Sequence, residues 1–151
     1  MQRLAEDCIF KKSKDPKIAL AEKKSKFSIE NPKRTEVIVY QVDGCLIKNG
    51  ERCDYLILID NQDLQVFVEL KGSEIVKAIG QLANSLEQLA NKRKDIHKQC
   101  FVIATRNRTP KRDPGLTNAQ NKFRKKYRKI NATLHIEIAK KKEGYRYSIS
   151  G

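Results

Sequence analysis

The sequence has no tryptophan, and aromatic residues make up only 7% of its 151 residues. It also lacks any apolar run near the roughly 18 to 20 residues that a membrane-spanning helix needs. A helix that binds a membrane surface carries Trp, Phe or Leu opposite its basic face, so the missing tryptophan argues against that mode as well. These absences predict a protein with no membrane partner.

The four cysteines form no CxxC pair, and the only histidines, His97 and His135, do not stand at zinc-binding spacing from them. The common zinc patterns are therefore excluded. The N-terminus, MQRLAEDCIFKKSKD, has acidic residues before its short apolar patch and lacks the apolar core of a secretory signal. We therefore expect reduced thiols and a cytoplasmic protein.

Positive charge is what the sequence has in excess. Thirty-two Lys and Arg residues stand against 18 Asp and Glu residues, which gives a formal net charge of +14. A polyanion is therefore the expected partner, and nucleic acid is a better candidate than a membrane surface. The length fits one domain over residues 1–151. Its core should span about 15–105, followed by a basic C-terminal extension at about 106–151.

The first half of the chain predicts one helix followed by three strands. Asp15-Pro16 has the form of an N-cap acid before a proline at the first helical position, which predicts a helix from 15 to about 27. Three apolar, β-branched stretches follow, separated by turn residues such as Asn49-Gly50. They predict an antiparallel meander of strands at 36–47, 52–60 and 65–71.

The second half predicts a helix that returns the chain to a parallel strand. Apolar residues recur at helical spacing from Ile75 to Leu89, which predicts a helix over 73–91. The buried strand expected at 98–105 can then run parallel to the third strand as a β-α-β unit. Further on, the pattern predicts a helix over 119–130, a strand over 132–139 and a last edge strand over 145–149.

The two turns of the meander set the register of its strands. Pairing Lys48 with Glu51 and Asp60 with Gln65 places a group of charged residues on one face: Asp43, Asp54, Glu69 and Lys71. The opposite face is apolar and should be covered by a helix. Asp43 is either an additional acid of this group or part of a strand irregularity at Asp43-Gly44.

Asp54, Glu69 and Lys71 are the candidate catalytic residues. Mg²⁺ takes oxygen ligands and usually keeps several waters, so Asp54, Glu69 and the carbonyl of Leu70 are candidate metal ligands. Lys71 could activate water and offset charge on the phosphorus. The structural alternative is an ion pair between Lys71 and Asp54, worth about 0.2 to 1 kcal/mol.

The order of these elements and motifs resembles the PD-(D/E)XK, or restriction-endonuclease-like, nuclease superfamily. The resemblance covers about residues 36–105 and rests on two motifs, Cys53-Asp54-Tyr55 and Val68-Glu69-Leu70-Lys71-Gly72. The sequence departs from the superfamily pattern by having Cys53 where a proline is usual. The resemblance implies an α/β fold with an αβββαβ core, in which helices flank a mixed central sheet. It also implies phosphodiester cleavage that depends on Mg²⁺ or Mn²⁺.

Some members of that superfamily add a glutamine on the helix after the meander, and Gln81 matches this position. A solvated polar side chain is an equally good interpretation of Gln81. Many members also carry an acid on the first helix. Glu22 is the helical candidate for that acid, with Glu6, Glu30 and Glu36 as alternatives.

The section from 106 to 129 is strongly basic, with ten Lys or Arg residues and one acid. We expect it to contact phosphates through charge, without reading sequence. The candidate nucleic-acid-binding residues are Arg106, Arg108, Lys111, Arg112, Lys122, Lys125 and Lys126. The alternative is a solvated surface without a partner.

Three functions follow from these observations. The first is a metal-dependent nuclease that acts on DNA rather than RNA. The second is a non-catalytic nucleic-acid-binding domain that keeps the nuclease fold, and the third is a basic structural partner in a ribonucleoprotein. The first is favoured because Asp54 and Glu69 repel phosphate unless a metal is bound. A chain of this size would cut both strands more readily as a homodimer, although no residue identifies an interface.

Overall fold

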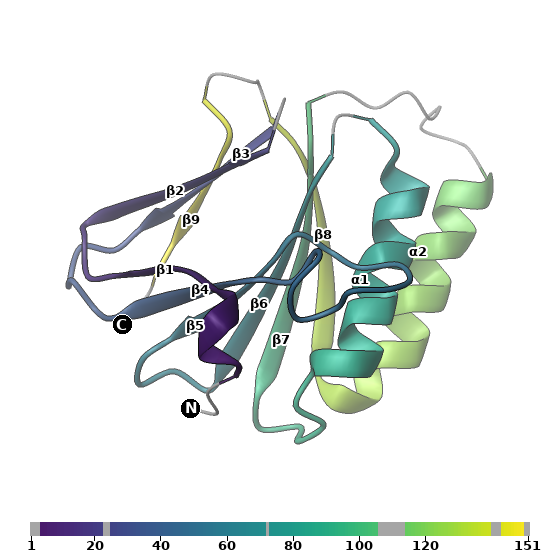
Figure 1. Cartoon of the computed structure of the whole chain (residues 1–151). Helices are drawn as coiled ribbons and strands as arrows, with labels where there is room; N and C mark the ends of the chain where they lie inside the picture. The colour runs from purple at the N-terminus through teal and green to yellow at the C-terminus, as the bar shows by residue number, and fades with distance from the viewer. Residues whose placement is uncertain (1–3, 23–24, 72, 106–113, 140–142, 150–151) are drawn as a thin grey trace.

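The structure is a computed structural model that describes residues 4–22, 25–71, 73–105, 114–139 and 143–149 (Figure 1). Two α-helices, nine strands and two short 3-10 helices are seen in these ranges. In chain order they are η1 (Glu6–Cys8), β1 (Ile9–Ser13), β2 (Lys17–Glu22), β3 (Ser25–Glu30), β4 (Val37–Gln41), β5 (Tyr55–Ile59), β6 (Leu64–Lys71), α1 (Ile75–Leu89), β7 (His97–Ala104), α2 (Pro114–Tyr127), η2 (Arg128–Ile130), β8 (Ala132–Ile138) and β9 (Tyr145–Ser148). No helix in these ranges is long and apolar enough to cross a bilayer.

Six strands form a mixed central sheet in the order β1-β4-β5-β6-β7-β8. Strands β1, β4, β5 and β6 pair antiparallel, whereas β6, β7 and β8 pair parallel. The predicted meander and the β6-α1-β7 unit are therefore confirmed. Strand β8 and the edge strand β9 are also found where the sequence predicts strands, and α2 begins five residues earlier than expected.

The predicted helix at 15–27 is wrong, because this stretch forms the antiparallel hairpin β2-β3 (Figure 1). Ile18 and Leu20 are buried while their neighbours on β2 are exposed, which is the period of a strand. Phe27 and Ile29 continue this inward-facing pattern on β3. The αβββαβ core thus lacks its expected first helix, and a second sheet of order β2-β3-β9 replaces it.

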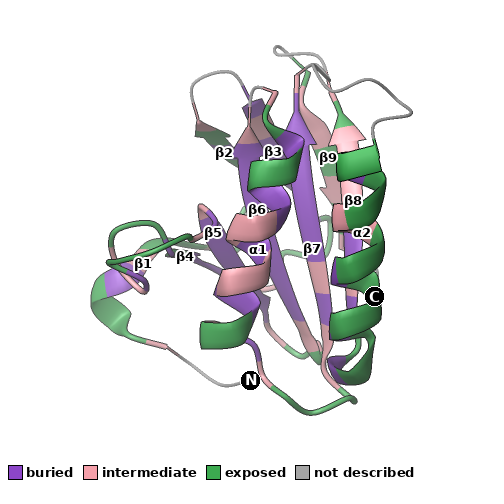
Figure 2. Cartoon of the chain, turned by 90° about the vertical axis from the view of Figure 1, so that its right-hand side faces the viewer, coloured by how far each residue is buried: buried purple, intermediate pink, exposed green. Residues whose placement is uncertain are grey.

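The two faces of the central sheet have different covers. Helices α1 and α2 lie on one face, and the second sheet lies on the other (Figure 1). The strands in the middle of the central sheet are buried between them (Figure 2). Helix α1 buries Ile75, Ile79, Leu82 and Leu86 as the spacing predicts. The expectation of helices on both sides of the sheet is therefore wrong.

The registers differ from those predicted. Tyr40 pairs with Leu56, so residues 42–54 form a loop, called the 42–54 loop below, in place of a tight hairpin at Asn49-Gly50. Asp43 therefore leaves the sheet. Leu56 pairs with Phe67 and not with Glu69, a shift of two residues that keeps the predicted face for β5 and β6. Their apolar face is covered by the second sheet, where the sequence predicts a helix.

Cys8 and Cys45 form a disulfide, contrary to the expectation of reduced thiols. Cys8 directly precedes β1 and Cys45 follows β4. Because β1 and β4 pair antiparallel, the Cα atoms of Cys8 and Cys45 lie 5.6 Å apart. Cys53 and Cys100 are free and buried.

Candidate metal centre

Asp54 lies at the start of β5, where the backbone of β6 fixes its position. Its N–H donates to the carbonyl of Val68 at 3.1 Å, and its Oδ2 accepts from the N–H of Leu70 at 2.8 Å. Because Tyr55 pairs with Val68, Asp54 comes beside Glu69 on the adjacent strand. The two carboxyl groups can hydrogen-bond to each other when one is protonated. Asp54 and Glu69 are called the carboxylate pair below.

Glu69 is almost completely buried, with 2% of its surface exposed. Its Oε2 lies 3.3 Å from the Nζ of Lys71, two residues along the same strand. Its Oε1 is buried and accepts no hydrogen bond from any residue that the structure describes. A buried carboxylate oxygen without a donor is costly, so this atom is available to a ligand.

The carboxylate pair is difficult to ionise fully in the absence of a cation. Burial raises the pKa of Glu69, and the nearby charge of Asp54 raises it further, while Lys71 opposes both effects. Burial also raises the pKa of Asp54, although the N–H of Leu70 lowers it. Two adjacent acids that resist losing both protons have the electrostatics of a cation site.

Gln81 projects from α1 towards the end of the 42–54 loop. Its Nε2 donates to the carbonyl of Arg52 at 3.2 Å, and its Oε1 is buried without a partner. Gln81 and Glu69 are thus the two described residues whose buried side-chain oxygens lack a hydrogen bond. The structural contact to Arg52 and the open oxygen together exclude a simple solvated side chain.

Glu22 approaches the carboxylate pair from the second sheet. Its Oε1 accepts from the hydroxyl of Tyr55 at 2.9 Å, and its charge raises the pKa of Asp54. It is the last residue of β2 and not a helical residue. Glu30 lies at the other end of the hairpin, since it pairs with Lys17 while Glu22 pairs with Ser25. 

The two other acids proposed as alternatives to Glu22 have different surroundings. Glu36 lies 3.9 Å from Lys12, and Glu6 is an exposed residue of η1. Among the acids considered from the sequence, Glu22 is therefore the one that the structure links to Asp54. The alternation of apolar residues in KIALAE is the sequence signal that could have placed it on a strand.

Asp43 is exposed and its Oδ1 lies 2.5 Å from the Nε of Arg52. It therefore does not stand opposite Leu56, as the predicted register requires, although its charge still raises the pKa of Asp54. Asp43 and Arg52 line an open cavity of about 310 Å³ that extends to Lys77 and Gln81 on α1. Gln81 connects this cavity with the end of the 42–54 loop, since it lines the cavity and donates to the carbonyl of Arg52.

The donor set suits a hard cation better than zinc. Within the described residues, no group of three or more His, Cys, Asp and Glu side chains is arranged to hold a metal. Mg²⁺ usually keeps several waters and needs only one or two carboxylates. Asp54 and Glu69 meet that requirement. The Oε1 atom of Glu69 is an oxygen ligand that the described residues leave unused. The carbonyl of Leu70 as a further ligand stays a prediction.

The basic residues predicted to bind nucleic acid fall into two groups. Arg106, Arg108, Lys111 and Arg112 lie outside the described residues. Ala104, the last residue of β7, pairs with Lys71 at the end of β6. On α2, Lys122, Lys125 and Lys126 are exposed, and Lys126 is 3.3 Å from Glu87. Nucleic-acid contact by either group stays a prediction.

No protein-family model, no curated protein and no solved structure matches this chain. The fold and the geometry of the carboxylate pair are therefore the observations on which a function can be argued.

Proposed function

We propose that the protein is a metal-dependent nuclease with a restriction-endonuclease-like core, which hydrolyses phosphodiester bonds in DNA rather than RNA. The observation that carries this proposal is the carboxylate pair, in which Glu69 keeps a buried oxygen without a donor beside Lys71. A protein with a net charge of +14 has an evident use for lysines near phosphate. It has no such use for two buried acids unless a cation binds them.

Mg²⁺ or Mn²⁺ held by Asp54 and Glu69 would polarise the phosphate and lower the pKa of a bound water. Asp54 contributes an oxygen whose direction is set by the N–H of Leu70. Lys71 places a positive charge next to Glu69, where it can stabilise negative charge that develops on the phosphate. The open Oε1 of Gln81 can accept a hydrogen bond from the attacking water or from a water of the metal shell.

Glu22 has a positioning role in this scheme. The hydroxyl of Tyr55 donates to its carboxylate, which holds the negative charge of Glu22 near Asp54. A third acid near the pair raises the preference for a cation over a shared proton. Replacing Glu22 with glutamine should therefore weaken metal binding while leaving Asp54 and Glu69 in place.

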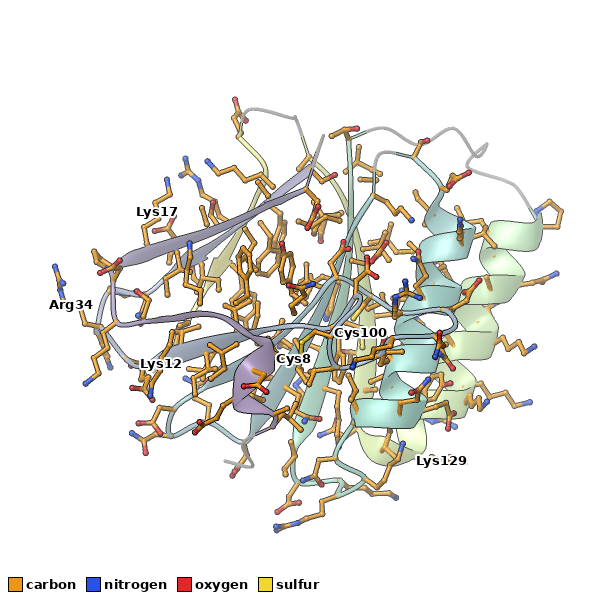
Figure 3. The ribbon with its side chains drawn as sticks, in the orientation of Figure 1. Cys8, Lys12, Lys17, Arg34, Cys100 and Lys129 are labelled. Carbon is orange, nitrogen blue, oxygen red and sulfur yellow. A yellow bond between two sulfur atoms is a disulfide. The ribbon has the colours of Figure 1, made fainter. Side chains whose placement is uncertain are left out.

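Cleavage should be assayed with plasmid, linear, branched and single-stranded DNA and with RNA, in Mg²⁺ and in Mn²⁺. We expect the wild type to cut at least one DNA substrate and Lys71→Ala to lose the activity. Lys129→Ala is the matched control, since Lys129 is exposed and lies at the far end of the helical layer (Figure 3). Equal cleavage by Lys71→Ala, or no cleavage of any substrate, would contradict the proposal. Salt-sensitive binding without cleavage or metal dependence would instead identify a non-catalytic binding domain.

Two further predictions belong to this proposal. A cytoplasmic location is expected because the N-terminus lacks the apolar core of a secretory signal, whereas the Cys8–Cys45 disulfide is unusual in a reducing compartment. Location must therefore be measured by cell fractionation. A homodimer that cuts both strands is testable by light scattering on the purified protein with and without a DNA duplex.

A further inference from the structure

We infer that Cys8 and Cys45 are a reversible redox site whose disulfide restrains two segments that lead to Asp54 and its neighbour Tyr55. The disulfide joins two segments that are distant in the sequence and that reach the same centre by different routes. One is the N-terminal segment, residues 4–13, and the other is the 42–54 loop. The expected effect on cleavage rests on the proposed function. The redox site itself, and its effect on the two segments, do not.

The N-terminal segment reaches the centre through Tyr55. The ring of Phe10 lies 5.3 Å from the ring of Tyr55, whose hydroxyl donates to Glu22. Strand pairing with β4 also holds this segment, through a register that shifts after Ile9, and the N–H of Leu4 donates to the hydroxyl of Tyr40. Lys11 and Lys12 add contacts to the carbonyl of Ala19 and to Glu36. Cys8 lies in front of the central sheet, next to the strand pairing (Figure 3). The disulfide is therefore an additional restraint, placed next to the point where the register shifts and beside Phe10.

The 42–54 loop reaches the centre directly, since it ends at Asp54. Polar side chains of α1 hold its second half: Ser85 accepts from the N–H of Cys53 at 2.8 Å, Gln81 donates to the carbonyl of Arg52, and Asn84 donates to the carbonyl of Glu51. Its first half has a β-bridge between Asp43 and Ile47 and the disulfide at Cys45. The buried side chains of Val42 and Ile47 and the ion pair between Asp43 and Arg52 hold this half as well. Breaking the disulfide would therefore loosen the turn around Cys45 without releasing the whole loop.

Accessibility restricts redox chemistry to this cysteine pair. Cys45 is partly exposed and Cys8 has 7% of its surface exposed, whereas Cys53 and Cys100 are completely buried. A reductant or oxidant in solution therefore cannot reach the sulfur atoms of Cys53 and Cys100. A dithiol reductant would attack one sulfur of the Cys8–Cys45 bond and form a mixed disulfide. Its second thiol then displaces the remaining sulfur, so the protein gains two electrons and two protons and the reductant becomes a cyclic disulfide.

The first test needs no enzymatic activity. Alkylation of the unfolded chain should count two thiols in protein kept with oxidised glutathione and four after dithiothreitol. Hydrogen–deuterium exchange should then rise by about tenfold in peptides covering 4–13 and 42–54 of the folded, reduced protein. Peptides from α2 serve as the internal control. Unchanged exchange in both segments after reduction would overturn the inference.

The second test links the redox state to the proposed reaction. Reduction should lower the cleavage rate by about 10- to 100-fold, because displaced catalytic groups lose that much. The Cys8→Ser/Cys45→Ser variant should match the reduced wild type in both redox conditions. A response of this variant to dithiothreitol would contradict the assignment of the redox site. If exchange responds to reduction but neither form cleaves nucleic acid, the redox site stands and the proposed function fails.

Discussion

The neighbouring inner strands β6 and β7 of the central sheet each bury a charged side chain, towards opposite ends of the sheet, and the two side chains have opposite surroundings. Lys98, near the start of β7, is completely buried, and its Nζ donates to the carbonyl of Arg93 at 2.6 Å and to that of Ile130 at 2.7 Å. Glu69, near the end of β6, is buried almost as fully but leaves Oε1 without a donor and lies against Asp54. Hydrogen bonds to the backbone compensate the charge of Lys98, whereas the charge of Glu69 is compensated only in part.

We propose that Lys98 is a structural charge and that Glu69 is a functional one. A buried charge contributes to stability only when hydrogen bonds compensate its lost hydration. Lys98 meets this condition by connecting the start of β7 with the end of η2. Glu69 does not meet it with protein atoms alone, and Lys71 compensates only one of its oxygens. The fold therefore tolerates a cost at Glu69 that a bound cation would remove.

The largest expected effect is on cleavage. Glu69→Gln should reduce the rate by on the order of 10³-fold, since it removes a metal-binding charge and keeps the size of the side chain. Glu137→Gln on β8 makes the same chemical change at a partly exposed position and is the matched control. Cleavage by Glu69→Gln at the rate of the control would remove Glu69 from the reaction.

The next effect is on stability and concerns Lys98, near the start of β7. Lys98→Met should lower the free energy of unfolding by about 2–4 kcal/mol, because the carbonyls of Arg93 and Ile130 lose their donor. Urea denaturation at pH 7 measures this change. Lys94→Met, at an exposed position, controls for the loss of charge. Similar stability of the two variants would mean that Lys98 is not the structural charge described here.

A smaller effect concerns the pH dependence of the free energy of unfolding, which the carboxylate pair should produce and Lys98 should not. Because burial raises the folded-state pKa values of Asp54 and Glu69, these two groups bind more protons in the folded protein than in the unfolded chain between about pH 4 and 8. Burial lowers the pKa values of His97 and His135, which has the opposite effect on proton binding. The contribution of the carboxylate pair to the stability of the metal-free protein should therefore fall as pH rises through this range, by roughly 1–3 kcal/mol. Melting temperatures at pH 5 and pH 8.5 test the sign. Glu69→Gln should flatten the dependence, whereas a steeper fall in that variant would contradict it.

The smallest effect concerns charges on the surface. The single variants Lys122→Ala, Lys125→Ala and Lys126→Ala should each weaken DNA binding only a few-fold and reduce the slope of log affinity against log salt by up to about 0.9. Lys126 should contribute least, because Glu87 already pairs with it. Fluorescence anisotropy over a series of salt concentrations measures both quantities. An unchanged slope in all three variants would place the DNA elsewhere.

Local sequence patterns predicted much of the sheet and the placement of Asp54, Glu69 and Lys71 on one face. The alternation within the meander, the helical spacing from Ile75 to Leu86 and the apolar run of β7 fix their elements locally, whereas the turn expected at Asn49-Gly50 is a longer loop. Asp54, Glu69 and Lys71 follow from them, because strand period alone puts Glu69 and Lys71 on one face. The shift of two residues between β5 and β6 preserved that face.

The remaining features depend on contacts that no local pattern contains. Asp15-Pro16 suggested a helix start, but the alternation of Ile18 and Leu20 with polar or small residues decides the structure once a sheet face is available to cover. Glu22 reaches Asp54 only through that hairpin. The Cys8–Cys45 disulfide likewise follows from the pairing of β1 with β4, which spacing between cysteines cannot reveal.

The most direct test of a cation site at Asp54 and Glu69 is a titration of the metal-free protein with Mn²⁺. Calorimetry and electron paramagnetic resonance both monitor the binding. The account predicts saturable binding that releases protons at pH 7, since the carboxylate pair holds protons before the metal enters. The Asp54→Asn and Glu69→Gln variants should lose this binding, while Glu137→Gln should keep it. Binding of equal affinity in all four proteins, or no saturable binding in the wild type, would contradict the claim that Asp54 and Glu69 hold a divalent cation.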